Sequence, residues 1–213
     1  MRTGRAQPRA PLAAPGRARR GGALIGPRRS RRSAPLGVHG RAYLLTGRPG
    51  VGKTTCLRRA LELLRMPAGG FLTEEIRERG RRVGFALLTL DGGRTTLAEE
   101  SRAKGPRVGK YGVNVDAIEQ LAVPAVREAI ERGWIVVIDE IGKMEMVAPA
   151  FREVVEEALR RPVTVLGTIL RGSHPWGDRL KAHPAVRLLE VTPANRESLP
   201  PHLAGLAAAR FSI

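Results

Sequence analysis

A run of eight residues has the types and the spacing needed to bind phosphate groups. It fits the pattern G-x-x-x-x-G-K-T and consists of Gly47, Arg48, Pro49, Gly50, Val51, Gly52, Lys53 and Thr54. Glycine lets the backbone pass close to an anion, and successive N–H groups form a nest that binds it. In this pattern the lysine reaches the β- and γ-phosphates of a nucleoside triphosphate, and the threonine hydroxyl binds Mg²⁺. We therefore predict a triphosphate site, with Lys53 contributing to catalysis and Thr54 binding the metal.

The residues on both sides of this run predict the strand and the helix that a phosphate-binding loop requires. Residues 41–46 predict a short buried strand, and residues 55–65 predict a helix with an apolar face. Backbone N–H groups at the start of that helix would point towards the phosphates. Thr55, the first of its residues, is therefore included among the predicted nucleotide contacts. The alternative is a chance glycine-rich turn after a strand.

Two consecutive carboxylates, Asp139 and Glu140, follow the strongest apolar run of the sequence, residues 134–138. The run predicts a buried strand, and open α/β sheets bind their ligands at the carboxyl ends of such strands. We predict that Asp139 binds Mg²⁺ through a water molecule and that Glu140 orients the attacking water, as a general base or as a water-positioning group. The alternative is that both carboxylates only end a strand at the surface.

Gly142 completes a D-x-x-G pattern with Asp139, as in GTPases, and is included among the predicted nucleotide contacts. A guanine-specific site would also carry an N-K-x-D motif, which the sequence lacks. The adjacent Glu140 instead favours an ATPase-like site, in which a glutamate prepares the water.

Strand and helix patterns alternate from residue 41 onwards, which predicts an α/β fold with a mostly parallel sheet flanked by helices. Further strands are predicted at residues 71–78, 83–90, 163–169 and 186–191. The turn signal at Arg79 and Gly80 joins the first two of these strands as a hairpin.

Proline residues mark the predicted helices of the second half. A helix is predicted over residues 116–132 with an interruption at Pro124, and another is predicted to begin at Pro149. A last helix is predicted to begin at Thr192, which would cap it, with Pro193 at its first position.

The first 40 residues differ in composition from the rest of the chain. They contain ten arginines and no Asp or Glu, whereas residues 41–213 carry the remaining +7 of a formal net charge of +17. Their low apolar content predicts a disordered Arg/Pro/Gly-rich extension at 1–40 and a folded domain at 41–213. The extension could bind nucleic acid or direct targeting. We favour a third interpretation, that it has no function and that translation begins near Val38.

The remaining composition predicts a cytoplasmic protein that does not enter membranes. No apolar run approaches the length of a membrane span, and Cys56 is the only cysteine, which excludes a disulfide within the chain. Cys56 falls one turn into the helix after the loop, where a small buried residue is expected. We expect a monomer.

Several further residues have a functional and a structural interpretation. Lys143 either brings a positive charge to the γ-phosphate or is an exposed loop residue, and Thr168 either contacts phosphate or water or is a buried structural threonine. Three arginines are candidates to stabilise charge during the reaction or are surface residues, namely Arg77, Arg171 and Arg179. Asn195 and Arg196 either approach the nucleobase or begin a helix. His174, His183 and His202 have no metal-ligand spacing.

The chain resembles the small thermophile-type nucleoside-triphosphatase family of bacteria and archaea, which includes the human cancer-related nucleoside-triphosphatase. The resemblance covers residues 42–203, and its most specific string is Asp-Glu-Ile-Gly-Lys-Met-Glu at residues 139–145. Other matching segments are residues 70–77, 83–85, 108–113 and 191–196. The resemblance implies a P-loop NTPase three-layer sandwich. It also implies slow, Mg²⁺-dependent hydrolysis of several nucleoside triphosphates with little base selectivity, and the basic extension departs from it.

The predicted reaction is hydrolysis of ATP, GTP, CTP or UTP to a nucleoside diphosphate and phosphate, with Mg²⁺ as cofactor. The first alternative is a nucleotide or small-molecule kinase, in which residues 171–181 would form an arginine-bearing lid. The second is a nucleic-acid-binding protein that nucleotide switches, suggested by the net charge. Glu140 favours water as the acceptor over the kinase alternative.

Overall fold

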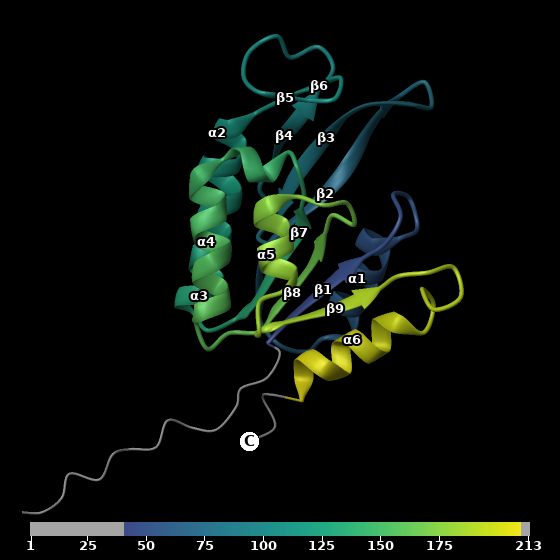
Figure 1. The fold of residues 1–213 in the computed structure, drawn as a ribbon, viewed down its shortest axis with the longest axis vertical. Helices are drawn as coiled ribbons and strands as arrows, with labels where there is room; N and C mark the ends of the chain where they lie inside the picture. The colour runs from purple at the N-terminus through teal and green to yellow at the C-terminus, as the bar shows by residue number, and fades with distance from the viewer. Residues whose placement is uncertain (1–40, 210–213) are drawn as a thin grey trace, which may run out of the picture. The chain divides into compact units, whose positions relative to one another are not determined.

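A computed structural model describes residues 41–209, all of which belong to one compact unit of the chain. They form a nine-stranded sheet with the strand order β5-β6-β4-β3-β2-β7-β8-β1-β9 (Figure 1). The predicted extension 1–40 and residues 210–213 lie outside the described residues.

One half of the sheet is parallel, as the sequence predicts. It pairs β2 with β7, β7 with β8, and β1 with both β8 and β9. These five strands are β1 (Ala42–Thr46), β2 (Ala68–Glu78), β7 (Ile135–Ile141), β8 (Val165–Ile169) and β9 (Val186–Glu190). Ile135 to Ile138 of β7 are completely buried, which explains why the central strand is apolar at every position.

The other half of the sheet is antiparallel and was predicted only in part. The predicted hairpin joins β2 to β3 (Arg81–Thr89) through Arg79 and Gly80, whose φ angles are 48° and 79°. Beyond it lie three strands that the sequence analysis missed, β4 (Arg94–Glu99), β5 (Arg107–Val108) and β6 (Tyr111–Val113). The last two are too short, and β4 too polar, to give an alternating apolar pattern.

Helices cover both faces of the sheet and complete a three-layer sandwich (Figure 1). The first face packs against α1 (Lys53–Leu63) and α6 (Leu199–Ala208), which bury Leu57 and Leu203. The second packs against α3 (Val123–Glu131), α4 (Pro149–Arg160) and α5 (Pro175–Lys181). Their buried residues include Phe151, Trp176 and Leu180. The predicted fold class is therefore confirmed.

The helix predicted over residues 116–132 is interrupted, and the interruption is a π-helical turn. It consists of α2 (Val115–Ala117), the π turn η1 (Ile118–Ala122) and then α3, whose second residue is Pro124. Proline has no N–H to donate within a helix. The wider π-helical turn before Pro124 accommodates the hydrogen bond that is missing there.

The first residue of the last helix lies six residues later than predicted, at Leu199 instead of Pro193. Residues 193–198 form turns, because the Asn195 side chain accepts the Thr192 N–H at 2.8 Å and donates to the Glu190 carbonyl at 2.8 Å. Side-chain bonds of this kind compete with helix formation. Ser198 then stands at the N-cap and Pro200 in the first turn, where proline is tolerated.

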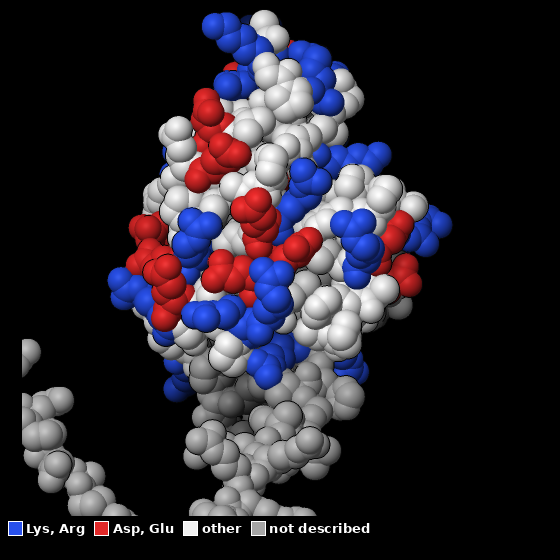
Figure 2. Space-filling model, turned by 60° about the vertical axis from the view of Figure 1, so that its left-hand side comes forward, with Lys and Arg blue, Asp and Glu red and all other residues white. Residues whose placement is uncertain are grey.

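The described surface carries charges of both signs. On the face shown in Figure 2, Lys and Arg side chains alternate with Asp and Glu side chains. None of the helices within residues 41–209 has the length and apolarity to cross a membrane.

Candidate active site

The loop after β1 has the backbone conformation that brings N–H groups close to an anion. Gly47, Gly50 and Gly52 have φ angles of 150°, 75° and 104°, which favour glycine. At Gly47 a Cβ would also lie 2.7 Å from the Val191 carbonyl oxygen, so no side chain fits there. The loop leads into α1 at Lys53, and the helix N-terminus faces the cleft described below.

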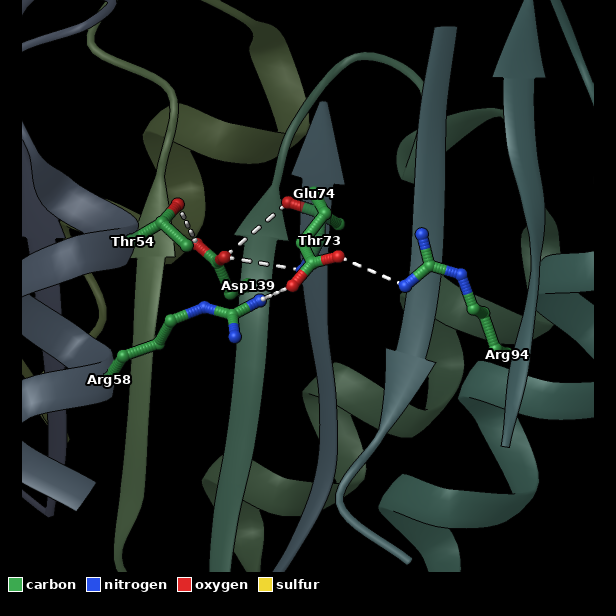
Figure 3. A network of polar contacts seen from close by, with 6 residues as sticks. All are labelled: Thr54, Arg58, Thr73, Glu74, Arg94 and Asp139. Carbon is green, nitrogen blue, oxygen red and sulfur yellow. Dashed lines mark hydrogen bonds and ion pairs between the residues drawn. The ribbon is translucent and has the colours of Figure 1, made fainter. Parts of the chain in front are cut away.

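Asp139 lies buried at the centre of the site, against the first turn of α1. Its Oδ1 accepts hydrogen bonds from the Thr54 hydroxyl at 3.2 Å and from the Thr168 hydroxyl at 2.7 Å. Its Oδ2 accepts from the N–H and the hydroxyl of Thr73, each at 3.4 Å (Figure 3). The side chain has no exposed surface, so Asp139 is not a surface residue that ends a strand.

The hydrogen-bond partners of Asp139 are all neutral, which leaves its charge without compensation by a side chain. Burial raises the pKa of Asp139, while the hydrogen bonds from Thr168, Thr54 and Thr73 oppose that rise. A buried carboxylate with only neutral partners is costly unless a cation lies beside it.

Glu140 points into the cleft beside Lys53. Burial raises the pKa of Glu140, the charge of Lys53 opposes the rise, and the charge of Asp139 adds to it. A raised pKa brings a carboxylate closer to the value at which a general base works near neutral pH. Glu140 is therefore suited to accept a proton from a water molecule.

Glu145 is a third buried carboxyl group, behind the loop that follows β7. Its Oε2 accepts the Gly142 N–H at 3.2 Å. A Cβ on Gly142 would lie 2.8 Å from the same oxygen and 3.6 Å from the Glu140 carboxyl carbon, so glycine is required there for space. Burial, and then the charge of Glu140, raises the pKa of Glu145 to about 8.

A cleft of about 730 Å³ opens beside these groups. The predicted residues that line it are Gly47, Pro49, Gly50, Gly52, Lys53, Thr54, Thr55, Glu140 and Gly142. Three others do not line it: Arg48 is exposed, Asp139 lies beneath its surface, and Val51 lines a smaller pocket of about 220 Å³. The cleft has the size of a small-molecule site.

The secondary candidates separate into residues near the cleft and residues away from it. Lys143 and Arg171 line the cleft, and Arg171 lies 3.8 Å from Glu190. Thr168 holds Asp139, as described above. Arg77 is bound to Glu75 and to the Gly80 carbonyl in the hairpin, while Arg179 is an exposed residue of α5.

The histidines have structural contacts. His174 caps α5 by accepting the Gly177 N–H at 3.3 Å, and His183 accepts the Ala185 N–H at 3.1 Å. His202 is exposed on α6. Within residues 41–209 there is no group of three His, Cys, Asp or Glu side chains that could hold a metal ion.

Two further residues singled out in the sequence, Cys56 of α1 and Arg196, line the smaller pocket. Arg196 lines that pocket, whereas Asn195 bonds to its own loop. Cys56 is buried in α1, and burial raises the pKa of its thiol to about 11. The thiol is therefore protonated near neutral pH, which fits the small buried residue expected there.

Sequence analysis missed a polar network that joins the site to the antiparallel half of the sheet. Next to Thr73, Glu74 pairs with Arg58 of α1 at 2.9 Å and with Arg94 of β4 at 3.0 Å (Figure 3). Arg58 stands one helical turn after Thr54, a spacing that could have placed it at the site. Arg94 gave no such signal, because its strand was not predicted.

Comparison with known proteins agrees with this geometry. The model of the NTPase family matches residues 42–204. The nucleoside-triphosphatase THEP1 of Thermotoga petrophila is 44% identical over 156 residues, which span 73% of this chain and 87% of the relative. The cancer-related nucleoside-triphosphatase homolog of Mus musculus is 38% identical over 179 residues, 76% of this chain and 94% of the relative.

A solved structure shares the fold as well. The crystal structure of THEP1 from the hyperthermophile Aquifex aeolicus aligns with a TM-score of 0.71 and 37% identity. The alignment covers 78% of this chain and 98% of that one. With a family model that matches most of its length, relatives above 30% identity and a phosphate-binding loop beside a buried carboxylate, the chain belongs to the nucleoside-triphosphatase family.

Proposed function

We propose that this enzyme hydrolyses the β–γ bond of nucleoside triphosphates with Mg²⁺ and with little preference for the base. The family supplies the reaction class, and the contact between Thr54 and Asp139 supplies the observation that carries the proposal. This contact between Thr54 and Asp139 brings the end of the phosphate-binding loop against the end of β7. The triphosphate, its metal and the attacking water would have to meet at that point.

The residues around Asp139 suit Mg²⁺. Oxygen ligands are those that this ion prefers, and Thr54 and Asp139 offer a hydroxyl and a carboxylate 3.2 Å apart. The buried charge of Asp139, surrounded by neutral partners, supports a bound cation. In this proposal Thr54 binds the ion directly and Asp139 binds it through a water molecule. The ion, when bound, neutralises charge that develops on the phosphate oxygens.

Each remaining role falls to a residue of the cleft. Backbone N–H groups of residues 47–54 bind the phosphates, and Lys53 places its charge at the β- and γ-phosphates. Glu140 accepts a proton from a water molecule as that water attacks the γ-phosphorus. The bond from the γ-phosphorus to the bridging oxygen breaks, and the products are a nucleoside diphosphate and phosphate.

The proposed low base selectivity is supported by the absence of a base-specific motif and by the charged residues beside the loop. The sequence has no N-K-x-D motif, and the smaller pocket beside the loop is lined by Arg59, Arg196 and Glu197, where Glu197 pairs with both arginines. Side chains that are already paired with each other do not select one nucleobase. An unpaired amide or carboxylate that hydrogen-bonds to the polar atoms of the base would do so.

Neither alternative function explains the site as well. The segment proposed as a kinase lid contains α5, which buries Trp176 and Leu180 and donates from Trp176 to Glu156 at 2.8 Å, so it is packed against the domain. The nucleic-acid alternative depends on residues 1–40, which lie outside the described residues. A cytoplasmic location and a monomeric state stay predictions.

The test is phosphate release by the full chain from ATP, GTP, CTP and UTP, each with and without Mg²⁺. We expect release from all four triphosphates, with rates within about tenfold of one another, and loss of release when EDTA removes the metal. Release from one triphosphate alone would overturn the proposed base tolerance. Equal release with EDTA would overturn the metal's role.

A further inference from the structure

One arginine that lines the cleft has no role in the hydrolysis proposed above. Arg58 stands one helical turn after Thr54 in α1, so the two side chains lie on the same face of the helix. Side chains of a helix also tilt towards its N-terminus, which here is the end that continues the phosphate-binding loop. The Arg58 side chain is therefore directed towards the part of the cleft where the phosphates would bind.

The ion pair of Arg58 lies next to the contacts that hold Asp139. Thr54 of α1 and Thr73 of β2 both hydrogen-bond to Asp139. The same two elements meet again where Arg58 pairs with Glu74, the residue after Thr73, at 2.9 Å (Figure 3). Both members of this ion pair line the same cleft as Glu140, so the guanidinium stands near the proposed place of the γ-phosphate.

The other arginines of the cleft have contacts that draw them elsewhere. Five cationic side chains within residues 41–209 line the cleft, namely Lys53, Arg58, Arg82, Lys143 and Arg171. Arg82 is fixed, because it donates to the Tyr111 hydroxyl at 3.0 Å and lies over the Phe85 ring, 5.0 Å from its centroid. Arg171 lies 3.8 Å from Glu190 of β9, on the far side of β1 from β7. Within the described residues Arg58 has one ion-pair partner, Glu74.

Glu74 has a second partner that would keep it paired if Arg58 moved. Arg94 of β4 lies 3.0 Å from its other carboxylate oxygen, and Figure 3 shows the two arginines on opposite sides of Glu74. The hydrogen bond from Arg94 is the largest cause of the lowered pKa of Glu74, and the hydrogen bond from Arg58 contributes less. The Arg58 side chain is 35% exposed, and ion pairs exposed to that degree hold their partners weakly. Arg58 can therefore leave Glu74 without leaving the carboxylate unpaired.

This side of the cleft carries an excess of positive charge. Two carboxylates, Glu74 and Glu75, are paired with four arginines, namely Arg58, Arg77, Arg82 and Arg94. Each carboxylate offsets only one of its two guanidinium charges, so an anion that enters the cleft can take over the other. A phosphate group suits that exchange, because a guanidinium binds phosphate oxygens through two parallel N–H groups, as it binds a carboxylate.

We propose that Arg58 is a catalytic residue of the hydrolysis, which leaves Glu74 when a triphosphate binds and donates hydrogen bonds to the γ-phosphate oxygens. The proposal rests on the proposed function, because it uses the same substrate and the same attacking water. Negative charge is spread over these oxygens as the bond to the leaving diphosphate breaks. The guanidinium stabilises that charge and gives up no proton, since arginine stays protonated in proteins. Glu74 meanwhile stays paired with Arg94.

The first experiment compares phosphate release from ATP with Mg²⁺ by the full chain and by its Arg58→Gln and Arg58→Lys variants. We expect Arg58→Gln to lower kcat by about a hundredfold, the order of loss when one donor to a developing charge is removed. Calorimetry should give an ATP affinity within about threefold of wild type, because the contact strengthens in the transition state. Arg58→Lys keeps the charge without the planar fork and should retain part of the rate.

The second experiment uses a transition-state analogue, which separates a catalytic role from a structural one. ADP with aluminium fluoride imitates the γ-phosphoryl group during its transfer. We expect wild type with Mg²⁺ to bind ADP more tightly when aluminium fluoride is present. Arg58→Gln should lose that gain and still bind ADP alone as wild type does. Thermal unfolding checks that the variants fold, and Arg58→Lys serves for the same comparison if Arg58→Gln does not.

Two further arginine variants test whether the effect belongs to Arg58. Arg132→Gln is the matched control, since Arg132 also pairs with a glutamate, Glu128 at 2.8 Å, and does not line the cleft. It should leave both kcat and analogue binding unchanged. Arg171→Gln tests the other arginine near the phosphates. Loss of the aluminium fluoride gain in Arg171→Gln, with the full gain kept in Arg58→Gln, would assign the role to Arg171 and overturn the proposal.

The outcomes distinguish this proposal from the proposed hydrolysis. Phosphate release by Arg58→Gln at the wild-type rate would overturn the role of Arg58 and leave the hydrolysis intact. A loss of ATP affinity as large as the loss in kcat/KM would also overturn it, because Arg58 would then bind substrate and transition state equally. Failure of wild type to release phosphate would overturn the hydrolysis itself.

Discussion

Three carboxyl groups lie within seven residues of one another, and their surroundings give them different roles. Asp139 is held by three threonines, Glu140 faces Lys53 in the cleft, and Glu145 accepts a backbone N–H behind them. Burial raises the pKa of each; the charge of Asp139 adds to the rise at Glu140, and the charges of Glu140 and Asp139 add to it at Glu145. Ionising carboxyl groups that are buried in this way costs folding free energy, and such perturbed groups are typical of functional sites.

The pKa of about 8 for Glu145 predicts a pH-dependent stability. Because the folded chain holds this proton more tightly than an unfolded chain, whose pKa is near 4.5, the contribution of Glu145 is present at low pH and is lost as the pH rises through 8. Glu145→Gln keeps an oxygen for the Gly142 N–H and does not ionise. Between about pH 5 and about pH 8.5 the free energy of unfolding should fall in wild type and fall less in the variant. We expect the two losses to differ by roughly 2–4 kcal/mol.

Urea unfolding of both proteins at the two pH values measures this difference. Equal losses in the variant and in wild type would show that Glu145 does not hold a proton in the folded state.

At the scale of the elements, the site depends on how closely β2 approaches β7. Gly70 of β2 pairs with Val137 of β7 and has a φ of 117°, and a Cβ at Gly70 would collide with the Val137 carbonyl oxygen. Three residues later, Thr73 contacts Asp139. The absence of a side chain at Gly70 thus allows the contact between the two strands that holds Asp139 in place.

Gly70→Ala tests this approach. We expect it to lower the free energy of unfolding by about 3 kcal/mol or more, because the new methyl group adds a steric clash to the strain of a positive φ. Gly80→Ala is the control, since Gly80 also has a positive φ, 79°, but has open space around it. It should cost about 1–2 kcal/mol. Equal costs in chemical denaturation would mean that β2 can move away from β7.

The elements also show what the sequence could and could not predict. The loop at residues 47–54 and the apolar run before Asp139 were recognisable because each is a local pattern, and parallel strands bring their ends to one edge. Contacts of Arg82 and Phe85 with the cleft were not recognisable, because the strand pattern of residues 83–90 does not show where β3 lies relative to the phosphate-binding loop. The start of α6 was misplaced because the Asn195 side chain bonds to its own loop.

At the scale of the whole molecule, the proposed catalytic groups and the densest positive charge lie in different parts of the chain, although residues 41–213 also carry a net charge of +7. The residues that we place in the site fall between Gly47 and Arg171, whereas ten of the arginines precede residue 41. On the face shown in Figure 2, charges of both signs alternate. The proposed catalytic groups therefore all lie in the described part of the chain.

Removal of residues 1–40 tests that separation. We expect phosphate release to stay within about twofold of the full chain, since no catalytic role is assigned to the removed residues, and any binding of RNA at low salt to weaken. Turnover that RNA stimulates only in the full chain would instead support the nucleotide-switched nucleic-acid alternative.

The central claim is that the phosphate-binding loop and the end of β7 act as one hydrolytic site, and Glu140→Gln tests it most directly. The variant keeps the shape of the side chain and removes its ability to accept a proton. We predict that phosphate release from ATP with Mg²⁺ falls by about a hundredfold or more, while calorimetry gives an ATP affinity within about twofold of wild type. Release at the wild-type rate would contradict the account.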